Sequence, residues 1–410
     1  MIELCFLNIS SRGSTTGVDR YLSVLIEGLH VYRKEINILL VDFVYNDKIL
    51  FSKYKEYSSY RKLTIPLPQR YSNFLNETYW MDKYFEVASR LLLPYLKEDM
   101  IYHVSSFNLI LLALKLKERL KGKIISHVHF IPWKEHYEHN KSYFNKLYAH
   151  YHSNTLETNI FFINKLEKDF YEKADKIICV TSYGRNFVHR LTGIPSTKIE
   201  IITNGIEDSA VNQEKIFHNS DNVEILFAGR VCEGKGIFFA LEALSIVRKE
   251  GYDFKFIIAG VCEDTTKLFI REKYHDLNVD ILDNIDFDTL KRLYSSVNIG
   301  ILPSLKEQAS YVAIEMAMFG LPVICTAIDG LDEIFTNDKN VLKVPAIFSK
   351  IKGLTIDIDT MANKIISLIE NKRLCSRLST NIRNLYEQEF TLPLMIEKTI
   401  TVYEKLINKE

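Results

Sequence analysis

The feature that most constrains the fold is an alternation of short apolar runs with helical patterns, which occurs in two successive blocks. In the first block, Ile2 to Ile9 and Ile36 to Phe43 are continuous apolar stretches of strand length, as expected of parallel strands buried on both faces. Between them, apolar side chains at helical spacing form one face; they are Val18, Tyr21, Leu22, Leu25, Ile26 and Leu29. Strand, glycine-containing loop, helix and strand make a βαβ unit, which predicts a parallel sheet.

The same alternation continues through the first half of the chain. Further runs of strand character lie at Met100 to Val104, Lys123 to His129, Ala174 to Thr181 and Lys198 to Thr203. The long segment from Tyr137 to Tyr171 is polar and aromatic, and we assign it to helix.

A second block of the same kind follows a change of composition. Residues Glu207 to Asn222 are polar with few apolar anchors, and we interpret them as a linker. Beyond them the strand-like runs are VEILFAG, FKFIIAG, NIGILPS and LPVICT. Helices are expected over Ile237 to Arg248, Thr265 to Tyr274, Tyr311 to Phe319 and, in several segments, Asp359 to Asn408.

Two such blocks predict an α/β protein with two Rossmann-like, doubly wound parallel sheets. We place an N-terminal domain at residues 1–205 and a C-terminal domain at 206–385. In such sheets ligands bind outside the carboxyl ends of the strands, so a cleft between the domains is the expected active site.

Composition and charge exclude several other classes. Lys plus Arg (52) equals Asp plus Glu (52), whereas a protein built to coat nucleic acid needs a basic excess. We see no secretory signal at the start of the chain and no run near the ~20 apolar residues of a membrane span. The six cysteines lie far apart without a C-x-x-C pair, which is typical of reduced structural thiols. We therefore expect a cytoplasmic protein.

One segment leaves peripheral membrane contact open. Phe107 to Lys123 begins with nine or ten mostly apolar residues and then becomes rich in lysine. Its basic side could touch the inner face of a membrane. A helix that faces the protein core is the alternative that we favour.

The most informative loop is FAGRVCEGKG, which leads from an apolar strand into a helix. It contains Gly229, Arg230, Lys235 and Gly236. A guanidinium fork, a lysine ammonium and the free amides of a helix N-terminus together suit a diphosphate. Arg and Lys in a loop are more often solvated surface charges, and it is the placement between a strand and a helix that favours ligand binding.

A second informative segment is PSLKEQASYVAIEMAMFGLPVI. Glu307 stands in the loop after a predicted strand, and Glu315 falls among apolar residues of the following helix. A carboxylate on an apolar helix is unfavourable unless it is paired or hydrogen-bonded, and sugar hydroxyls are suitable partners. The alternative is a glutamate on a solvated helix face.

Together these segments resemble the donor half of GT-B fold glycosyltransferases, specifically the retaining glycosyltransferase family 4. That family's pattern is G-R-x(4,5)-K-G, then P-S-x-x-E-x(7)-E, then G-x-P-V and a G-L-x-E-I turn. The matching elements, in order, are Gly229-Arg230, Lys235-Gly236, Pro303-Ser304, Glu307, Glu315, Gly320 to Val323 and Gly330 to Ile334.

The first half resembles the family in fewer elements. S-R-G-S-T-T-G-V-D-R is similar to the glycine-rich first loop, in which Gly17 would allow approach to the donor phosphate. His127-Val128-His129 resembles a strand-end histidine, and Asn204-Gly205-Ile206 the N-G-[IV] element. The family likeness also implies that a final helix in residues 386–410 crosses back onto the first domain.

The resemblance implies roles for the matching residues. Arg230 and Lys235 would hold the diphosphate and stabilise charge on the departing nucleotide without a metal or other cofactor. Glu307 would bind the donor sugar and Glu315 the ribose hydroxyls, while His127 or His129 would lie near the reacting carbon. The partners implied are a nucleoside-diphosphate sugar and a glycan, lipid-linked or peptide acceptor, in bacterial glycan or glycolipid assembly, with no nucleic acid.

The chain departs from the family in two places. Ala309, Ser310 and Tyr311 replace the usual Phe-Gly-Leu between the two glutamates. Because backbone amides there would face the donor, Ser310 and Tyr311 leave the identity of the donor open. Thr16-Gly17 stands where a Gly-Gly pair is common.

Other readings are weaker. The segment HVHFIPWKEHYEH contains four histidines, but neither a cysteine nor an H-E-x-x-H pattern accompanies them, so we expect no metal site. A non-catalytic glycosyltransferase-like subunit remains the main alternative, although the chain keeps Arg230, Lys235 and Glu307. Phosphorylase, epimerase and dehydrogenase readings are less favoured; no G-x-G-x-x-G follows the first strand.

Overall fold

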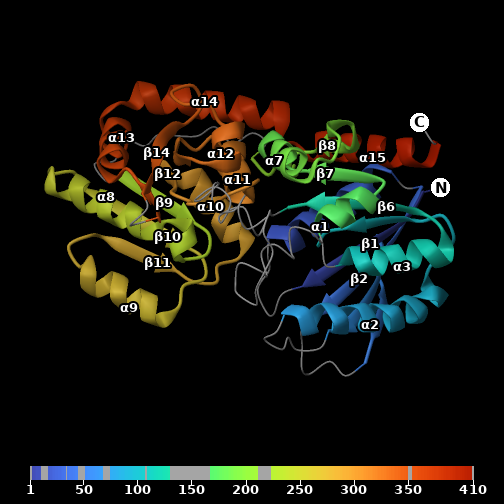
Figure 1. Cartoon of the computed structure of the whole chain (residues 1–410). Helices are drawn as coiled ribbons and strands as arrows, with labels where there is room; N and C mark the ends of the chain where they lie inside the picture. The colour runs from blue at the N-terminus through green and yellow to red at the C-terminus, as the bar shows by residue number, and fades with distance from the viewer. Residues whose placement is uncertain are drawn as a thin grey trace. The chain divides into compact units, whose positions relative to one another are not determined.

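The computed structural model describes residues 2–10, 17–33, 35–44, 51–67, 74–106, 109–129, 167–210, 223–349 and 353–408. The chain divides into two compact units, and each is built around a sheet of its own (Figure 1). The N-terminal unit contains Met1–Thr203 together with Pro393–Glu410, and the C-terminal unit contains Asn204–Leu392.

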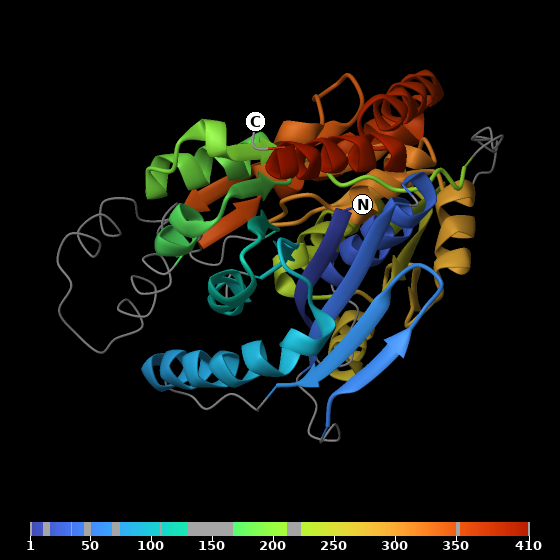
Figure 2. The same cartoon turned by 90° about the vertical axis from the view of Figure 1, so that its right-hand side faces the viewer.

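The sheet of the N-terminal unit has the strand order β3-β4-β2-β1-β5-β6-β7-β8. Its strands are β1 (Ile2–Ser10), β2 (Ile36–Val44), β3 (Lys53–Glu56), β4 (Arg61–Pro66), β5 (Ile101–Val104), β6 (Lys123–Val128), β7 (Lys176–Cys179) and β8 (Ile199–Ile201). Every described pairing is parallel except that of the edge strand β3 with β4; in Figure 2, β4 lies beside β2 and β3 lies on the outer side of β4. The order reverses at β1, as in doubly wound sheets.

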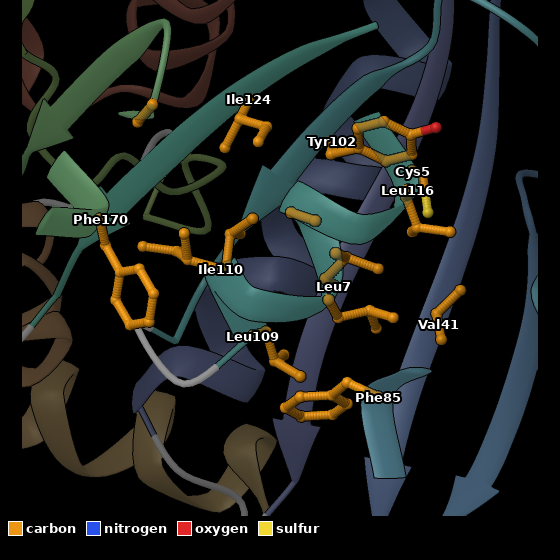
Figure 3. Close-up of a cluster of buried hydrophobic side chains, with 14 of the residues drawn as sticks. Cys5, Leu7, Val41, Phe85, Tyr102, Leu109, Ile110, Leu116, Ile124 and Phe170 are labelled. Carbon is orange, nitrogen blue, oxygen red and sulfur yellow. The ribbon is translucent and has the colours of Figure 1, made fainter. Parts of the chain in front are cut away.

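Helices cover this sheet because their apolar faces are buried against it. They are α1 (Gly17–Tyr32), α2 (Phe74–Leu92), α3 (Ile110–Leu120), α7 (Ser182–Thr192) and, after the C-terminal unit, α15 (Leu392–Asn408). Figure 3 shows Leu109, Ile110 and Leu116 of the α3 segment gathered with strand residues such as Leu7 and Val41. The helix that we favoured as core-facing is therefore confirmed.

The C-terminal unit repeats the plan with the order β11-β10-β9-β12-β13-β14-β15. Its strands are β9 (Val223–Ala228), β10 (Phe254–Ala259), β11 (Val279–Leu282), β12 (Ile299–Leu302), β13 (Val323–Ala327), β14 (Leu342–Ser349) and β15 (Gly353–Ile356). Its helices are α8 (Ile237–Lys249), α9 (Asp264–Lys273), α10 (Phe287–Ser296), α11 (Tyr311–Met318), α12 (Asp329–Ile334), α13 (Ile358–Glu370) and α14 (Lys372–Glu389). Within this second sheet, the edge pairing of β14 with β15 is antiparallel and the other described pairings are parallel.

The prediction of two doubly wound α/β sheets is confirmed, with one difference. Each sheet carries an antiparallel edge strand, so both are mixed rather than wholly parallel. Of the expected linker, Glu207 to Asn222, the structure describes residues 207–210, which belong to no helix or strand and are held by the Asp208–Arg383 ion pair and the burial of Ala210; the rest lies outside the described residues. Most of Tyr137 to Tyr171, which we assigned to helix, lies outside the described residues.

Candidate functional site

The first element of the candidate site is the loop between β9 and α8. A short 3-10 turn, Glu233–Lys235, ends at Gly236, whose φ is +69°. A Cβ at Gly236 would lie 1.8 Å from the carbonyl oxygen of Pro303, far inside any real contact. Glycine therefore lets the backbone beside Lys235 pack directly on the segment that follows β12. The Leu305 amide also donates to the Gly234 carbonyl at 3.1 Å.

This close packing brings together two of the predicted residues. The Lys235 ammonium donates to the Glu307 carboxylate in an ion pair. The lysine side chain is 36% exposed and the glutamate 15%, so the pair lies at the surface of the C-terminal unit. Arg230, in the same loop, is exposed, and within the described residues it takes part in no ion pair.

A second turn supports Glu307 from the other side. The Gly330 amide donates to the Glu307 carbonyl at 2.9 Å, and the Glu307 amide donates to Asp329 Oδ2 at 3.2 Å. A Cβ at Gly330 would lie 1.5 Å from the Gln308 carbonyl oxygen. The G-L-x-E-I turn thus has a structural explanation, because only glycine allows the start of α12 to touch the Glu307 loop.

The residues between the two glutamates form the start of α11. Ser310 is its N-cap, and the Ser310 hydroxyl accepts from the Ala313 amide at 3.3 Å. Serine in place of the family's usual glycine therefore satisfies one amide of the first turn. Asn204 holds the same loop, since its Nδ2 donates to the Ala309 carbonyl at 3.0 Å. Tyr311 is buried as the first residue of the helix.

Glu315 lies inside the C-terminal unit. Its side chain is 0% exposed, and Oε2 accepts from the Tyr294 hydroxyl at 2.8 Å. The alternative of a solvated helix face is therefore wrong. Partnership with ribose hydroxyls stays a prediction.

The two predicted histidines belong to the N-terminal unit. His127 is the fifth residue of β6 and is 3% exposed, and His129 follows the strand. Their rings stack with centroids 4.1 Å apart and an interplanar angle of 2°, as side chains two residues apart on one strand face should. Tyr21 of α1 meets both rings edge-on, each with a centroid distance of 4.6 Å.

A third histidine, His103 of β5, joins this group. Its Nε2 lies 3.0 Å from His127 Nδ1, and its Nδ1 lies 2.7 Å from the Tyr403 hydroxyl of α15. The pKa of His103 is lowered to about 3, mainly by burial and to a smaller extent by the nearby His129. Burial likewise lowers the pKa of His127, and that of His129 to about 3. All three rings are therefore neutral at pH 7.

Two predicted features remain, the glycine of the first loop and the histidine-rich segment. Gly17 is the exposed first residue of α1, with open space where a Cβ would be. Within the described ranges, no group of three or more His, Cys, Asp or Glu side chains could hold a metal ion. The rest of the histidine-rich segment, from residue 130 onward, lies outside the described residues.

In the segment considered for membrane contact, Phe107 to Lys123, lysine side chains form ion pairs with acidic residues of the same unit. Lys115 pairs with Asp82 at 2.9 Å, and Lys117 with Asp175 at 2.7 Å. None of the described helices is both long enough and apolar enough to span a bilayer. All six cysteines are free, and all but Cys232 are buried, as the prediction of structural thiols requires.

Sequence reasoning missed two residues that shape these groups, His103 and Tyr403, and the contact that a third residue makes. His103 lies within the apolar run of β5, between Tyr102 and Val104, where a buried histidine could have been suspected. The family likeness implied that a final helix returns to the N-terminal domain, but no sequence signal identified Tyr403 on that helix. Asn204 was noted as part of a motif, but its contact with Ala309 joins positions far apart in the sequence.

Two doubly wound units, with a lysine–glutamate pair at the carboxyl ends of β9 and β12, define a protein of the GT-B class. A model of the "Glycosyl transferases group 1" family matches residues 208–385, and one of "Glycosyltransferase Family 4" matches residues 33–210. Together these matches cover most of the chain, which belongs to glycosyltransferase family 4.

Curated relatives of the chain are also glycosyltransferases. An uncharacterized glycosyltransferase of Methanocaldococcus jannaschii is 30% identical over 42% of this chain and 46% of its own length. The capsular polysaccharide biosynthesis glycosyltransferase CapM of Staphylococcus aureus is 24% identical over 53% and 54%. The chain thus spans about half the length of these relatives.

The fold is shared with solved structures over nearly whole chains. Sucrose-phosphate synthase of Thermosynechococcus elongatus has a TM-score of 0.75 and 18% identity, covering 99% of this chain and 100% of its own. Anabaena HepE in complex with UDP-glucose has a TM-score of 0.65 and 14% identity, covering 98% and 100%.

Proposed function

We propose that this chain is a retaining, metal-independent glycosyltransferase that moves a sugar from a nucleoside-diphosphate sugar to a hydroxyl acceptor. The observation that carries the proposal is the Lys235–Glu307 pair. It places a phosphate-binding ammonium beside a carboxylate that accepts hydrogen bonds from sugar hydroxyls. The HepE structure with UDP-glucose supports a nucleotide-sugar donor on the same fold.

In this reaction the bond between the anomeric carbon and the donor phosphate oxygen breaks, and a bond from that carbon to the acceptor oxygen forms. The acceptor proton passes to the departing phosphate, so the nucleoside diphosphate leaves as the second product. Lys235 and Arg230 stabilise the charge that develops on this leaving group. Glu307 orients the donor sugar. Because Glu315 is buried, its surroundings must open when the ribose binds.

For the acceptor we propose only a broad chemical class. CapM is named for capsular polysaccharide biosynthesis, which supports a role in bacterial glycan or glycolipid assembly with a glycan, lipid-linked or peptide acceptor. We place this activity in the cytoplasm; Lys115 and Lys117 of the segment considered for membrane contact are instead paired with acidic residues of the N-terminal unit. The alternative, a non-catalytic partner subunit, is less favoured because the lysine and glutamate are present and paired.

The test is release of nucleoside diphosphate from a panel of UDP-, GDP- and ADP-sugars, in EDTA and with glycan acceptors. Lys235→Ala and Glu307→Ala should each abolish release. A partly exposed ion pair contributes only about 0–1 kcal/mol of stability, so both variants should stay folded. Lys249→Ala, an exposed lysine of α8, is the charge-matched control. Normal turnover in Lys235→Ala would contradict the assignment of this site.

A further inference from the structure

The histidine group of the N-terminal unit contains a chain of hydrogen-bonding atoms that crosses three elements. It runs from the Tyr403 hydroxyl in α15 to His103 Nδ1 at 2.7 Å, and from His103 Nε2 to His127 Nδ1 at 3.0 Å. All three side chains are buried. In the described part of the chain, the far nitrogen of the last ring, His127 Nε2, is buried and has no hydrogen-bond partner.

The positions of the protons follow from the chemistry of the first member. The Tyr403 side chain is 0% exposed, and a buried hydroxyl proton without an acceptor is costly. Among the described residues, His103 Nδ1 is the acceptor within reach. The hydroxyl therefore donates to Nδ1, and a neutral imidazole that accepts at one nitrogen carries its proton on the other.

The same step repeats at the second ring. His103 Nε2 carries the proton and donates to His127 Nδ1, which must then be unprotonated. The Tyr21 hydroxyl, 3.1 Å from the same Nδ1, is placed to donate to that atom as well. Two donors directed at Nδ1 leave the proton of His127 on Nε2. The reverse order of donors would leave the Tyr403 proton without a described acceptor.

We propose that His103 and Tyr403 are positioning residues that fix His127 as the Nε2–H tautomer, so that this ring acts on substrate only as a hydrogen-bond donor. The inference rests on the proposed function for the identity of that substrate. An Nε2–H group recognises an oxygen lone pair, such as that of a sugar hydroxyl or a phosphate. It cannot remove a proton from the acceptor, which agrees with proton transfer to the departing phosphate.

The arrangement gives the last helix a specific role. Pro393–Glu410 belongs to the N-terminal unit although it follows the C-terminal unit in sequence. Tyr403 makes this segment part of the histidine group rather than only a cover for the sheet.

The experiment is a two-bond ¹H–¹⁵N correlation spectrum of the full chain with ¹⁵N-labelled histidine, without ligand, at pH 7. A His127→Gln variant assigns the resonances of that ring. We expect Nδ1 to be unprotonated and Nε2 protonated in His127. In Tyr403→Phe, a measurable fraction of His103 and His127 should shift to the other tautomer. An Nδ1–H tautomer of His127 in the wild type, or no change in Tyr403→Phe, overturns the inference.

Three further variants separate positioning from packing. His103→Gln can accept from Tyr403 and donate to His127, so it should keep the His127 tautomer, whereas His103→Leu should lose it. Tyr386→Phe removes the 3.0 Å hydrogen bond that the buried Tyr386 hydroxyl donates to the Ile206 carbonyl, within the C-terminal unit. It should destabilise the protein without changing the His127 signals, and a changed tautomer in this control also counts against the inference.

Turnover adds a separate readout. Tyr403→Phe should lower kcat for nucleotide-sugar transfer by about threefold to tenfold, the value of one net hydrogen bond, and His103→Gln should restore most of the loss seen in His103→Leu. If no nucleotide sugar is turned over, the proposed function fails while the tautomer result stands. If turnover is normal but His127 is the Nδ1–H tautomer, only the present inference fails.

Discussion

The substitution Gly330→Ala tests whether the turn at the start of α12 positions the candidate donor loop. A Cβ at this residue would lie 1.5 Å from the Gln308 carbonyl oxygen, and ordinary contact begins at 3.4 Å. The turn and the Gln308 peptide must therefore separate by about 2 Å, because backbone atoms on both sides leave no flexible side chain to give way.

Gly330→Ala should lower both the stability of the C-terminal unit and the rate of transfer. Overpacking of this kind costs about 1–3 kcal/mol, or roughly 2–4 °C in Tm for each kcal/mol in a unit of this size. The shift also breaks the 2.9 Å bond from the Gly330 amide to the Glu307 carbonyl. Since a misplacement of ~1 Å near the chemistry can cost about 10²-fold in rate, we expect transfer to fall by about two orders of magnitude.

The matched control is Gly234→Ala, a glycine of the neighbouring Lys235 loop. A Cβ there would meet only Lys306 Cε, at an ordinary 3.5 Å, and Gly234 has no positive φ. Differential scanning calorimetry and release of nucleoside diphosphate should show this variant close to the wild type. If the two variants behave alike in both assays, the reasoning about the turn is refuted.

Three further predictions use different parts of the molecule. Burial lowers the pKa of His103 to about 3, so below about pH 6.5 the unfolded chain binds a proton that the folded unit does not. The free energy of unfolding should therefore fall as the pH drops from 6.5 to 4, by up to ~1.4 kcal/mol per pH unit for each buried histidine. Urea titrations should show a flatter pH dependence in His103→Leu, and an unchanged slope contradicts this. Asn204→Ala should cost about 1–3 kcal/mol, because the Ala309 carbonyl loses its donor; an unchanged urea midpoint argues against the contact. Cys232 should react first with a thiol reagent, since the other cysteines are buried; Cys232→Ser should remove that fast phase, and its persistence would show a second accessible thiol.

Periodicity was sufficient for the architecture because its signals are local. Buried parallel strands read as apolar runs, and Ile2 to Ile9 differs from the observed β1 by one residue. The edge strand β3 (Lys53–Glu56) is exposed at every residue, so it has no apolar pattern by which to be found. The ion pair of Asp208 with Arg383 could not be predicted from local patterns either, because it joins residues far apart in the sequence.

The candidate site was predictable where it depends on motifs, and not where it depends on long-range contacts. The family pattern identified Lys235 and Glu307, and the structure adds that they touch. The same pattern named Glu315 but did not show that it lies buried against Tyr294. The return of the last helix to the first domain was predicted from the family likeness, but the contact of Tyr403 with His103 was not, because it joins residues far apart in the sequence.

Binding of nucleotides by the purified protein tests the central claim most directly. A ligand that binds only the folded state at about 100 times its Kd stabilises that state by ~2.7 kcal/mol, which corresponds to roughly 5–10 °C in Tm. The account predicts such a shift with one of UDP, GDP or ADP, unchanged by EDTA, lost in Lys235→Ala and kept in Lys249→Ala. No shift with any of the three nucleotides, or one that EDTA abolishes, would contradict it.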